Sequence, residues 1–215
     1  MKQNLVRMHF RNRKEWLGAR PFVLGASEAA AVVGDSKFQT RAQLWEVKTG
    51  KTRAPDLSGN EAVQRGVRME GALRGWFTAS HPEFKIYHHP YDMLCQKDRT
   101  WLIATLDGEF VHRESGRHGA VEIKTAAPRG NWAEWDGQVP AMYYDQILHQ
   151  HLATGFDWFF LVAGLWKQNG DVIIREYEWN ADEGFRADAE WLLAAEESFW
   201  GYVQRNQRPP EPIRL

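Results

Sequence analysis

The spacing of apolar residues changes about a third of the way along the chain. In the first part, apolar positions recur three and four residues apart, a period that predicts helices. Ser27 is expected to cap a short helix that Gly34 ends. A second helix begins at a capping box formed by Thr40 and Gln43. A long helix is predicted over residues 61–79, and its apolar face is expected to contain Val63, Val67, Leu73 and Phe77.

The middle of the chain alternates instead, as strands do. Strand-like runs are "FKIYHHP", "YDMLCQ", "WLIATLDGEFVH" and "GAVEIKTA", and the turn-rich "RESGRHG" predicts a hairpin between the last two. A helix over residues 142–154 follows, then the strand pair "WFFLVAGLW" and "DVIIREYEW", then a helix over residues 182–204. This order predicts an α/β (α+β) fold with a mixed, mostly antiparallel sheet flanked by helices.

Composition limits the class of protein. The chain has 215 residues, of which 43% are hydrophobic, and this suits one compact domain. It contains no run of about 18 apolar residues and no apolar segment behind its basic N-terminus, so we expect a soluble, cytoplasmic protein without a membrane span. Cys95 is the only cysteine, which excludes a disulfide framework or a cysteine-ligated metal within one chain.

The charge distribution gives a local signal rather than a global one. The net charge is −1, so the overall basic field of many nucleic-acid-binding proteins is missing. The first 20 residues are nevertheless basic, with Glu15 as their only acid. They form either a basic entrance for nucleic acid or a solvated terminus.

Candidate chemistry lies in "GAVEIKTA". In a strand, Val121 and Ile123 face one side, so Glu122 and Lys124 share the other. Asp107 stands at the end of the apolar run "WLIATL", and it joins this pair if the two runs are adjacent strands. Two neighbouring carboxylates raise each other's pKa unless a divalent cation lies between them, and Mg²⁺ prefers oxygen ligands.

With such a cation, Lys124 would orient or deprotonate a water molecule, or neutralise developing charge, and the set indicates phosphodiester hydrolysis. Taken alone, a Glu-x-Lys pattern is also typical of an exposed strand face that carries an ion pair.

Four blocks of sequence resemble one family. They are "RPFVLGASEAAAVVG" with "QLWEVKTG", "RGVRMEGALRGWF", "ATLDGEF" with "AVEIKTA", and "MYYDQILHQHLATG". Together, from about Arg20 to Gly155, they resemble the lambda exonuclease and YqaJ-like viral recombinase nucleases of the PD-(D/E)xK fold. One departure is a proline that stands four residues beyond Lys124, at Pro128, where the family often has a proline or cysteine after the lysine strand.

The resemblance implies a role for each matching residue. It places a Mg²⁺ site, with Mn²⁺ as a substitute, on Glu70, Asp107, Glu122 and the carbonyl of Ile123. It places the attacking water near Lys124 and Gln146, and a 5′ phosphate on Arg20 and Ser27. From the residues alone, Ser27 reads as a plain helix cap, and Glu70 reads either as a ligand or as a solvated helix carboxylate.

The family pattern also implies an overall function. The expectation is a single nuclease domain over residues 1–215, with a helical part (1–80), a catalytic sheet core (81–180) and a C-terminal helix and tail (181–215). It would digest one strand of linear double-stranded DNA from the 5′ end in a Mg²⁺-dependent reaction. The implied partners are DNA ends, a single-strand annealing protein and further copies of the chain in a toroidal trimer.

Two alternatives remain open: an endonuclease with the same metal site, and a non-catalytic module that binds DNA ends. Trp132 and Trp135 are candidates to stack on DNA bases, or else to pack under a loop or at a subunit interface, and Arg129 would meet phosphate or solvent. His149 and His151 point apart on a helix, so they are not expected to share a metal.

Overall fold

A computed structural model describes residues 4–126 and 132–212 of the chain. Its main sheet has five strands in the order β3-β6-β7-β8-β9. Their bounds are β3 Phe84–Tyr87, β6 Gly108–His112, β7 His118–Ala126, β8 Trp158–Trp166 and β9 Val172–Asn180. Only the β7–β8 pair in this sheet is parallel, and the other pairs are antiparallel. The predicted mixed, mostly antiparallel sheet is therefore confirmed.

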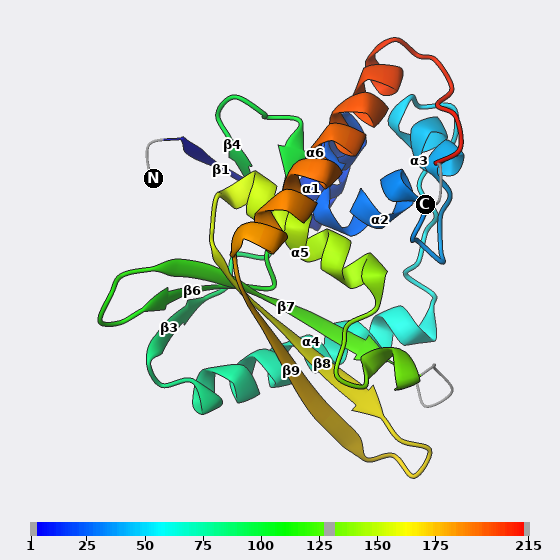
Figure 1. The fold of residues 1–215 in the computed structure, drawn as a ribbon. Coiled ribbons are helices and arrows are strands. Elements are labelled where there is room, and N and C mark those ends of the chain that lie inside the picture. Colours follow the sequence, from blue (N-terminus) through cyan, green and yellow to red (C-terminus); the bar gives the residue numbers. More distant parts are fainter. Residues whose placement is uncertain (1–3, 127–131, 213–215) are drawn as a thin grey trace.

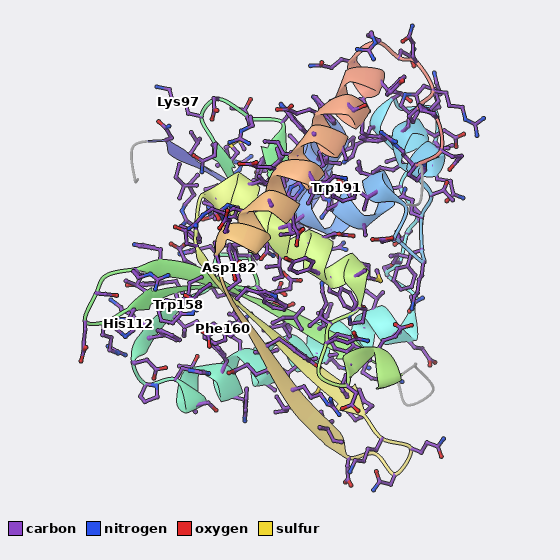
Figure 2. All side chains as sticks on the ribbon, viewed as in Figure 1. Lys97, His112, Trp158, Phe160, Asp182 and Trp191 are labelled. Atoms are coloured by element: carbon purple, nitrogen blue, oxygen red, sulfur yellow. The ribbon has the colours of Figure 1, made fainter. Side chains whose placement is uncertain are left out.

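Helices cover both faces of this sheet (Figure 1). Helix α4 (Glu61–Ser80) lies along one face, and α5 (Ala141–Thr154) and α6 (Glu183–Gln204) lie on the other. On the α4 side, aromatic rings from β6 and β8 gather, and Figure 2 labels His112, Trp158 and Phe160 among them. Because α5 links the parallel strands β7 and β8, it is the crossover helix of a βαβ unit.

Smaller elements of the N-terminal part pack beside α5 and α6. They are α1 (Arg13–Ala19), α2 (Ala29–Val33), α3 (Arg41–Lys48), the 3₁₀ turns η1 (Arg20–Phe22) and η2 (Ala26–Glu28), and the short strand β2 (Leu24–Gly25). β2 runs parallel to β5 (Leu102–Ile103), the strand that precedes β6 in the chain. The N-terminal segment is thereby joined to the strand that leads into the main sheet. A further 3₁₀ turn, η3 (Trp132–Trp135), follows β7.

The sequence pattern missed strand β1 (Leu5–His9), which pairs antiparallel with β4 (Asp92–Gln96). Its basic residue Arg7 donates hydrogen bonds to Asp92 at 2.8 Å and to Glu109 at 2.5 Å. Part of the basic N-terminus is therefore neutralised within the fold instead of lying free in solvent. This result depends on partners far away in the sequence.

The expectation for Ser27 as a helix cap is wrong. Gly25 precedes the 3₁₀ turn, and its N–H donates to the carboxylate of Glu28 at 2.8 Å. The Ser27 hydroxyl instead accepts a hydrogen bond from Arg20 at 3.1 Å. The Glu28 carboxylate, whose two oxygens only accept hydrogen bonds, therefore takes the capping role that was expected for the Ser27 hydroxyl.

The other predicted helix ends agree with the structure. The Thr40 hydroxyl accepts from the Gln43 N–H at 3.2 Å, and the Gln43 side chain accepts from the Thr40 N–H at 2.9 Å. Gly155 ends α5 with a left-handed backbone, φ 69°.

The predicted apolar face of α4 is only half correct. Leu73 and Phe77 are buried, whereas Val63 and Val67 are 40% and 66% exposed. Leu73 and Phe77 are buried because they belong to the apolar cluster that α4 forms with β6, β7 and β8. In the described part of the chain, no helix has the length and apolar character needed to cross a bilayer.

Candidate active site

Asp107 lies immediately before β6, where the β6–β7 ladder begins. The first pair of the ladder joins Gly108 to Val121, and beyond it the Oδ2 of Asp107 accepts the N–H of Ile123 at 2.8 Å. The N–H and C=O of one residue point to the same edge of a strand, so the Ile123 carbonyl also faces Asp107. The strands that carry Asp107 and Glu122 are therefore adjacent, and the side chains converge at the open end of the ladder.

Glu122 and Lys124 share the face of β7 that α5 covers. Glu122 is 2% exposed, and its Oε1 accepts a hydrogen bond from Lys124 Nζ at 2.5 Å. The same Nζ lies 5.1 Å from the ring centre of Tyr143 on α5. Val121 and Ile123 pack into the apolar cluster on the α4 side. The alternation predicted for "GAVEIKTA" is thus confirmed.

The acids and the lysine of this site perturb one another. Burial raises the pKa of Asp107 well above its usual value, and the nearby charge of Glu122 raises it further. Burial by itself would lower the pKa of Lys124, but the carboxylates of Glu122 and Asp107 outweigh burial and raise it. Lys124 is accordingly held as a cation between two acids.

Glu70 approaches the same place from α4. Its Oε1 accepts a hydrogen bond from Arg74 at 2.9 Å, and Arg74 also donates to the backbone carbonyl of Asp107 at 2.9 Å. The charge of Glu70 contributes to the raised pKa of Asp107. Glu70 thus lies within electrostatic reach of Asp107, with Arg74 as its ion-pair partner.

The donors at this site suit a hard divalent cation. They are oxygen atoms from carboxylates and one backbone carbonyl, which Mg²⁺ prefers, and a cation would relieve the repulsion that raises the pKa of Asp107. Across residues 4–126 and 132–212, no three acidic, histidine or cysteine side chains already surround one point in a metal-binding geometry. Instead Lys124 pairs with Glu122 and Arg74 pairs with Glu70.

Sequence reasoning missed one residue of this site. Gln150 of α5 is fully buried, and its Nε2 donates to Glu122 Oε2 at 2.5 Å. Gln146, which the family resemblance selects, is also buried and lies one helical turn earlier on the same face as Gln150 and Tyr143. A second glutamine four residues after Gln146 was the available signal. The role of Gln146 remains a prediction.

Arg20 and Ser27 are in contact with each other and are backed by a buried ion pair. Arg20 donates to the Ser27 hydroxyl at 3.1 Å and lies 3.6 Å from Glu28. Lys48, which is almost completely buried, binds Glu28 at 2.7 Å and the backbone carbonyl of Arg20 at 2.8 Å. The guanidinium and the hydroxyl are therefore held in place by a charged support beneath them.

Two further contacts connect Arg20 to the segment of Asp107. The guanidinium lies over the ring of Trp16, 5.0 Å from the ring centre. The indole N–H of Trp16 donates to the hydroxyl of Thr105 at 3.0 Å, and Thr105 stands two residues before Asp107. Trp16 thus contacts both the candidate phosphate site, through Arg20, and the segment that leads to Asp107, through Thr105.

The candidate tryptophans and histidines make other contacts. Trp135 is buried against Tyr143 and Tyr177, which agrees with packing rather than stacking on bases. Arg129 and Pro128 lie outside the described residues, and so does the side chain of Trp132. His149 and His151 bind separate partners, as their spacing predicts.

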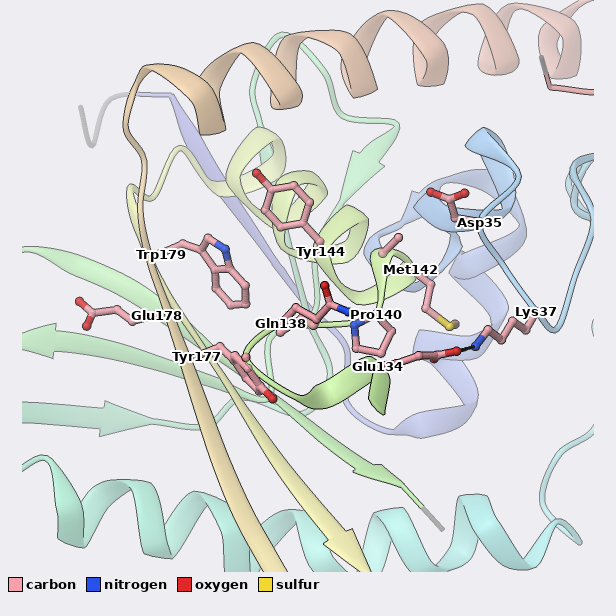
Figure 3. A pocket seen from close by; sticks show the side chains of 13 residues that line it. Asp35, Lys37, Glu134, Gln138, Pro140, Met142, Tyr144, Tyr177, Glu178 and Trp179 are labelled. Atoms are coloured by element: carbon pink, nitrogen blue, oxygen red, sulfur yellow. Dashed lines mark hydrogen bonds and ion pairs between the residues drawn. The ribbon is translucent and has the colours of Figure 1, made fainter. Parts of the chain in front are cut away.

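A pocket of about 800 Å³ opens beside the N-terminal end of α5 (Figure 3). Its described lining comes from the N-terminal end of α5, the turn before it, β9 and the loop after α2, and includes Tyr144, Tyr177, Trp179 and the Lys37–Glu134 ion pair. None of the candidate metal ligands is among these lining residues. The pocket is therefore separate from the carboxylate site.

The chain is similar in sequence and in fold to known proteins. The chain is 28% identical over 139 residues to the protein YqaJ of Bacillus subtilis (strain 168), covering 64% of this chain but only 41% of that longer relative. An alkaline exonuclease from Laribacter hongkongensis, LHK-Exo, has the same fold, with a TM-score of 0.61 and 20% identity over 89% of this chain and 95% of that one. Its complex with dAMP aligns with a TM-score of 0.58 and 21% identity over the same shares.

This likeness in three dimensions shows that the fold is the PD-(D/E)xK fold of phage-type exonucleases. The family model of the YqaJ-like viral recombinase domain matches residues 15–157, which is most of the chain. The chain therefore belongs to the YqaJ-like viral recombinase domain family.

Proposed function

We propose that this chain is a metal-dependent exodeoxyribonuclease that digests one strand of linear duplex DNA from its 5′ end. The observation that carries the proposal is the convergence of Asp107, Glu122 and Lys124 at the open end of the β6–β7 ladder. An ion pair on an exposed strand face would not account for the burial of Glu122, which is 2% exposed, or for the raised pKa of Asp107. The exonuclease activity of the structural relative LHK-Exo supports the same assignment.

The proposed ligands of the cation are the carboxylates of Asp107, Glu122 and Glu70 and the carbonyl of Ile123. Mg²⁺ suits this oxygen set, and Mn²⁺ is the expected substitute. When bound, the cation supplies Lewis acidity to the scissile phosphate and lowers the pKa of a water molecule. Arg74 would then keep Glu70 and the Asp107 backbone together through its two hydrogen bonds.

Lys124 acts as a fixed positive charge in this proposal. Its raised pKa favours the ammonium form, so it neutralises charge that develops on the phosphate and donates hydrogen bonds to orient the attacking water. Gln146 assists from α5 by hydrogen bonding near the same water. The adjacent Tyr143 ring stabilises the ammonium through its π face.

The proposed 5′-to-3′ polarity depends on Arg20 and Ser27. A guanidinium can bind phosphate through two parallel hydrogen bonds, and the hydroxyl beside it offers another donor. The support formed by Glu28 and Lys48 fixes where that phosphate would lie. An anchor of this kind is of use to an exonuclease, which must recognise a strand end.

The biological setting is also part of the proposal. Digestion of one strand would leave 3′ single-stranded tails for a single-strand annealing protein, as expected for a recombinase of this family. A toroidal trimer would hold the duplex topologically, which suits a chain whose net charge is only −1. We place this activity in the cytoplasm.

One experiment separates this proposal from an endonuclease that uses the same carboxylates. Linear duplex DNA with a 5′ phosphate at one end only is incubated with Mg²⁺ and the protein, beside closed circular plasmid and the Lys124→Ala variant. Progressive loss of the phosphorylated strand, an intact circle and an inert variant are the expected results. Cleavage of the circle would establish the endonuclease, and binding to DNA ends without any cleavage would establish a non-catalytic module.

A further inference from the structure

The side-chain amide of Gln150 faces one oxygen of Glu122. The Nε2 of Gln150 lies 2.5 Å from Glu122 Oε2, while Lys124 Nζ lies 2.5 Å from Oε1. An ionised carboxylate only accepts hydrogen bonds, so the amide must present its NH₂ group to Oε2. Both oxygens of Glu122 are thus held, one by a neutral donor and the other by a cation.

The orientation of this amide leaves its own oxygen without a partner. Gln150 Oε1 is buried and accepts no hydrogen bond from the described residues. An ionised carboxylate is a stronger hydrogen-bond acceptor than a neutral group, so the donor end of the amide is the end that turns to Glu122. Among the described residues, the contact of the NH₂ group with Glu122 therefore sets the orientation of this amide.

Neighbouring residues prevent α5 from turning Gln150 away. His149 binds Glu196 of α6 through Nδ1 at 2.6 Å and the carbonyl of Ile103 through Nε2 at 2.9 Å. The Thr154 hydroxyl donates to the backbone carbonyl of Gln150 at 2.6 Å. Ile103 belongs to the strand that leads to Asp107. Helix α5 is therefore connected to the segments of two candidate metal-binding carboxylates, Asp107 and Glu122.

We propose that Gln150 is a positioning residue that fixes the rotamer of Glu122 and directs its free lone pairs toward the cation. The inference rests on the proposed function, because it assigns to Glu122 the role of a metal ligand. Gln150 itself contacts neither DNA nor the cation. It acts as the hydrogen-bonding partner behind a ligand, a type of residue whose loss typically weakens metal binding about 10–100-fold.

The test compares the metal affinity of variants on α5. Gln150→Met keeps a similar volume without the donor, and Gln150→Asn keeps the amide but withdraws it by one methylene. Tyr144→Phe is the matched control, because it removes a hydrogen bond of the same helix, from Tyr144 to Asp188, without touching Gln150 or Glu122. Mn²⁺ binding is measured by calorimetry in the absence of DNA, and thermal unfolding is followed in parallel.

The expected result is that both Gln150 variants bind Mn²⁺ about 10–100-fold more weakly while Tyr144→Phe matches the wild type, whatever its melting temperature. On DNA, kcat should fall in the Gln150 variants and KM for DNA should stay unchanged. Wild-type affinity in both Gln150 variants, or an equal loss in Tyr144→Phe, would overturn the inference and leave the proposed function intact. If the wild type neither binds Mn²⁺ nor digests DNA, the proposed function fails and this inference fails with it.

Discussion

The side chain of Asp107 continues the hydrogen bonding between β6 and β7: its Oδ2 accepts the Ile123 N–H at 2.8 Å, directly beyond the Gly108–Val121 pair. The carboxylate is consequently placed by strand pairing rather than by a flexible loop. The same contact leaves the Ile123 carbonyl pointing to Asp107, where no partner strand continues. Sheet geometry alone therefore brings two of the proposed metal ligands together.

Replacement of Lys124 by Met should remove catalysis. Loss of a group that positions or transfers protons in the transition state typically lowers a rate by about 10²–10⁴-fold, and the buried Glu122 would also lose its cation. Strand digestion is measured by release of labelled nucleotides, at a temperature where circular dichroism shows that the variant is folded. Lys97→Met, on an exposed lysine elsewhere, is the charge-matched control. A Lys124 variant within tenfold of the wild type would contradict its assignment.

Replacement of Arg20 by Ala should affect only phosphorylated ends. A charge-assisted hydrogen bond contributes about 1.5–3 kcal/mol, so digestion of 5′-phosphorylated DNA should slow about ten- to a hundredfold, with little change on 5′-hydroxyl DNA. Initial rates on the two substrates give the ratio directly. Arg13→Ala on the exposed face of α1 serves as the control. An equal loss on both substrates would show that Arg20 does not bind the terminal phosphate.

Asp145 should make stability decrease toward alkaline pH. Burial, with help from the charges of Asp35 and Glu196, raises its pKa to about 7. Since the pKa is higher in the folded than in the unfolded chain, the folded state keeps the proton between about pH 4 and pH 7. Stability is therefore fully present below about pH 4 and is lost as the pH rises from there through 7.

The Asp145→Asn variant provides the measurement. It should match the wild type below about pH 4 and exceed it at pH 8 by at most a few kcal/mol, because one pKa unit corresponds to about 1.4 kcal/mol. Urea unfolding at several pH values tests this, with the exposed Asp98→Asn as control. Stability curves of the Asp145 variant and the wild type that run parallel across this range would refute the prediction.

Two glycine substitutions should change stability in opposite directions. A Cβ at Gly119, at the start of β7, would overlap the Phe110 ring and the Trp158 carbonyl, so Gly119→Ala should destabilise the fold by about 1–3 kcal/mol or more. Gly75 is an exposed residue of α4 with open space around its Cα, so Gly75→Ala should stabilise the helix by about 0.5–1 kcal/mol. Melting temperatures that shift in the same direction would contradict this reading of β7 packing.

The features that the sequence predicted well are those set by local geometry. Alternation in a strand is fixed by the backbone, so the opposite faces of Val121 and Glu122 could be assigned without knowing any neighbour. The capping box of Thr40 and Gln43 depends on four consecutive residues, and it formed as expected. The convergence of Asp107 with "VEIK" needed only one hairpin.

The features that were missed depend on distant partners. Arg7 belongs to a strand because Asp92 and Glu109 receive its guanidinium. Ser27 lost the capping position because the carboxylate of Glu28 reached the Gly25 N–H. The contact of Gln150 with Glu122 follows from the rotation of α5, and tertiary packing around His149 sets that rotation. The spacing of apolar residues along the sequence does not show which residue of α5 is turned toward Glu122.

The parallel pairing of β7 with β8 also determines when the site can assemble during synthesis. Glu122 is paired with Leu161, and all of α5 lies between them in the chain. The ribosome therefore releases Asp107, Glu122 and Lys124 before it has made either the helix that carries Gln150 or the strand that supports β7. Contacts of this sequence separation form slowly, because loop closure precedes the energy gained from pairing. A nascent chain thus holds the acidic residues before the elements that bring them together exist, and the proposed nuclease chemistry has to wait for the second half of the chain.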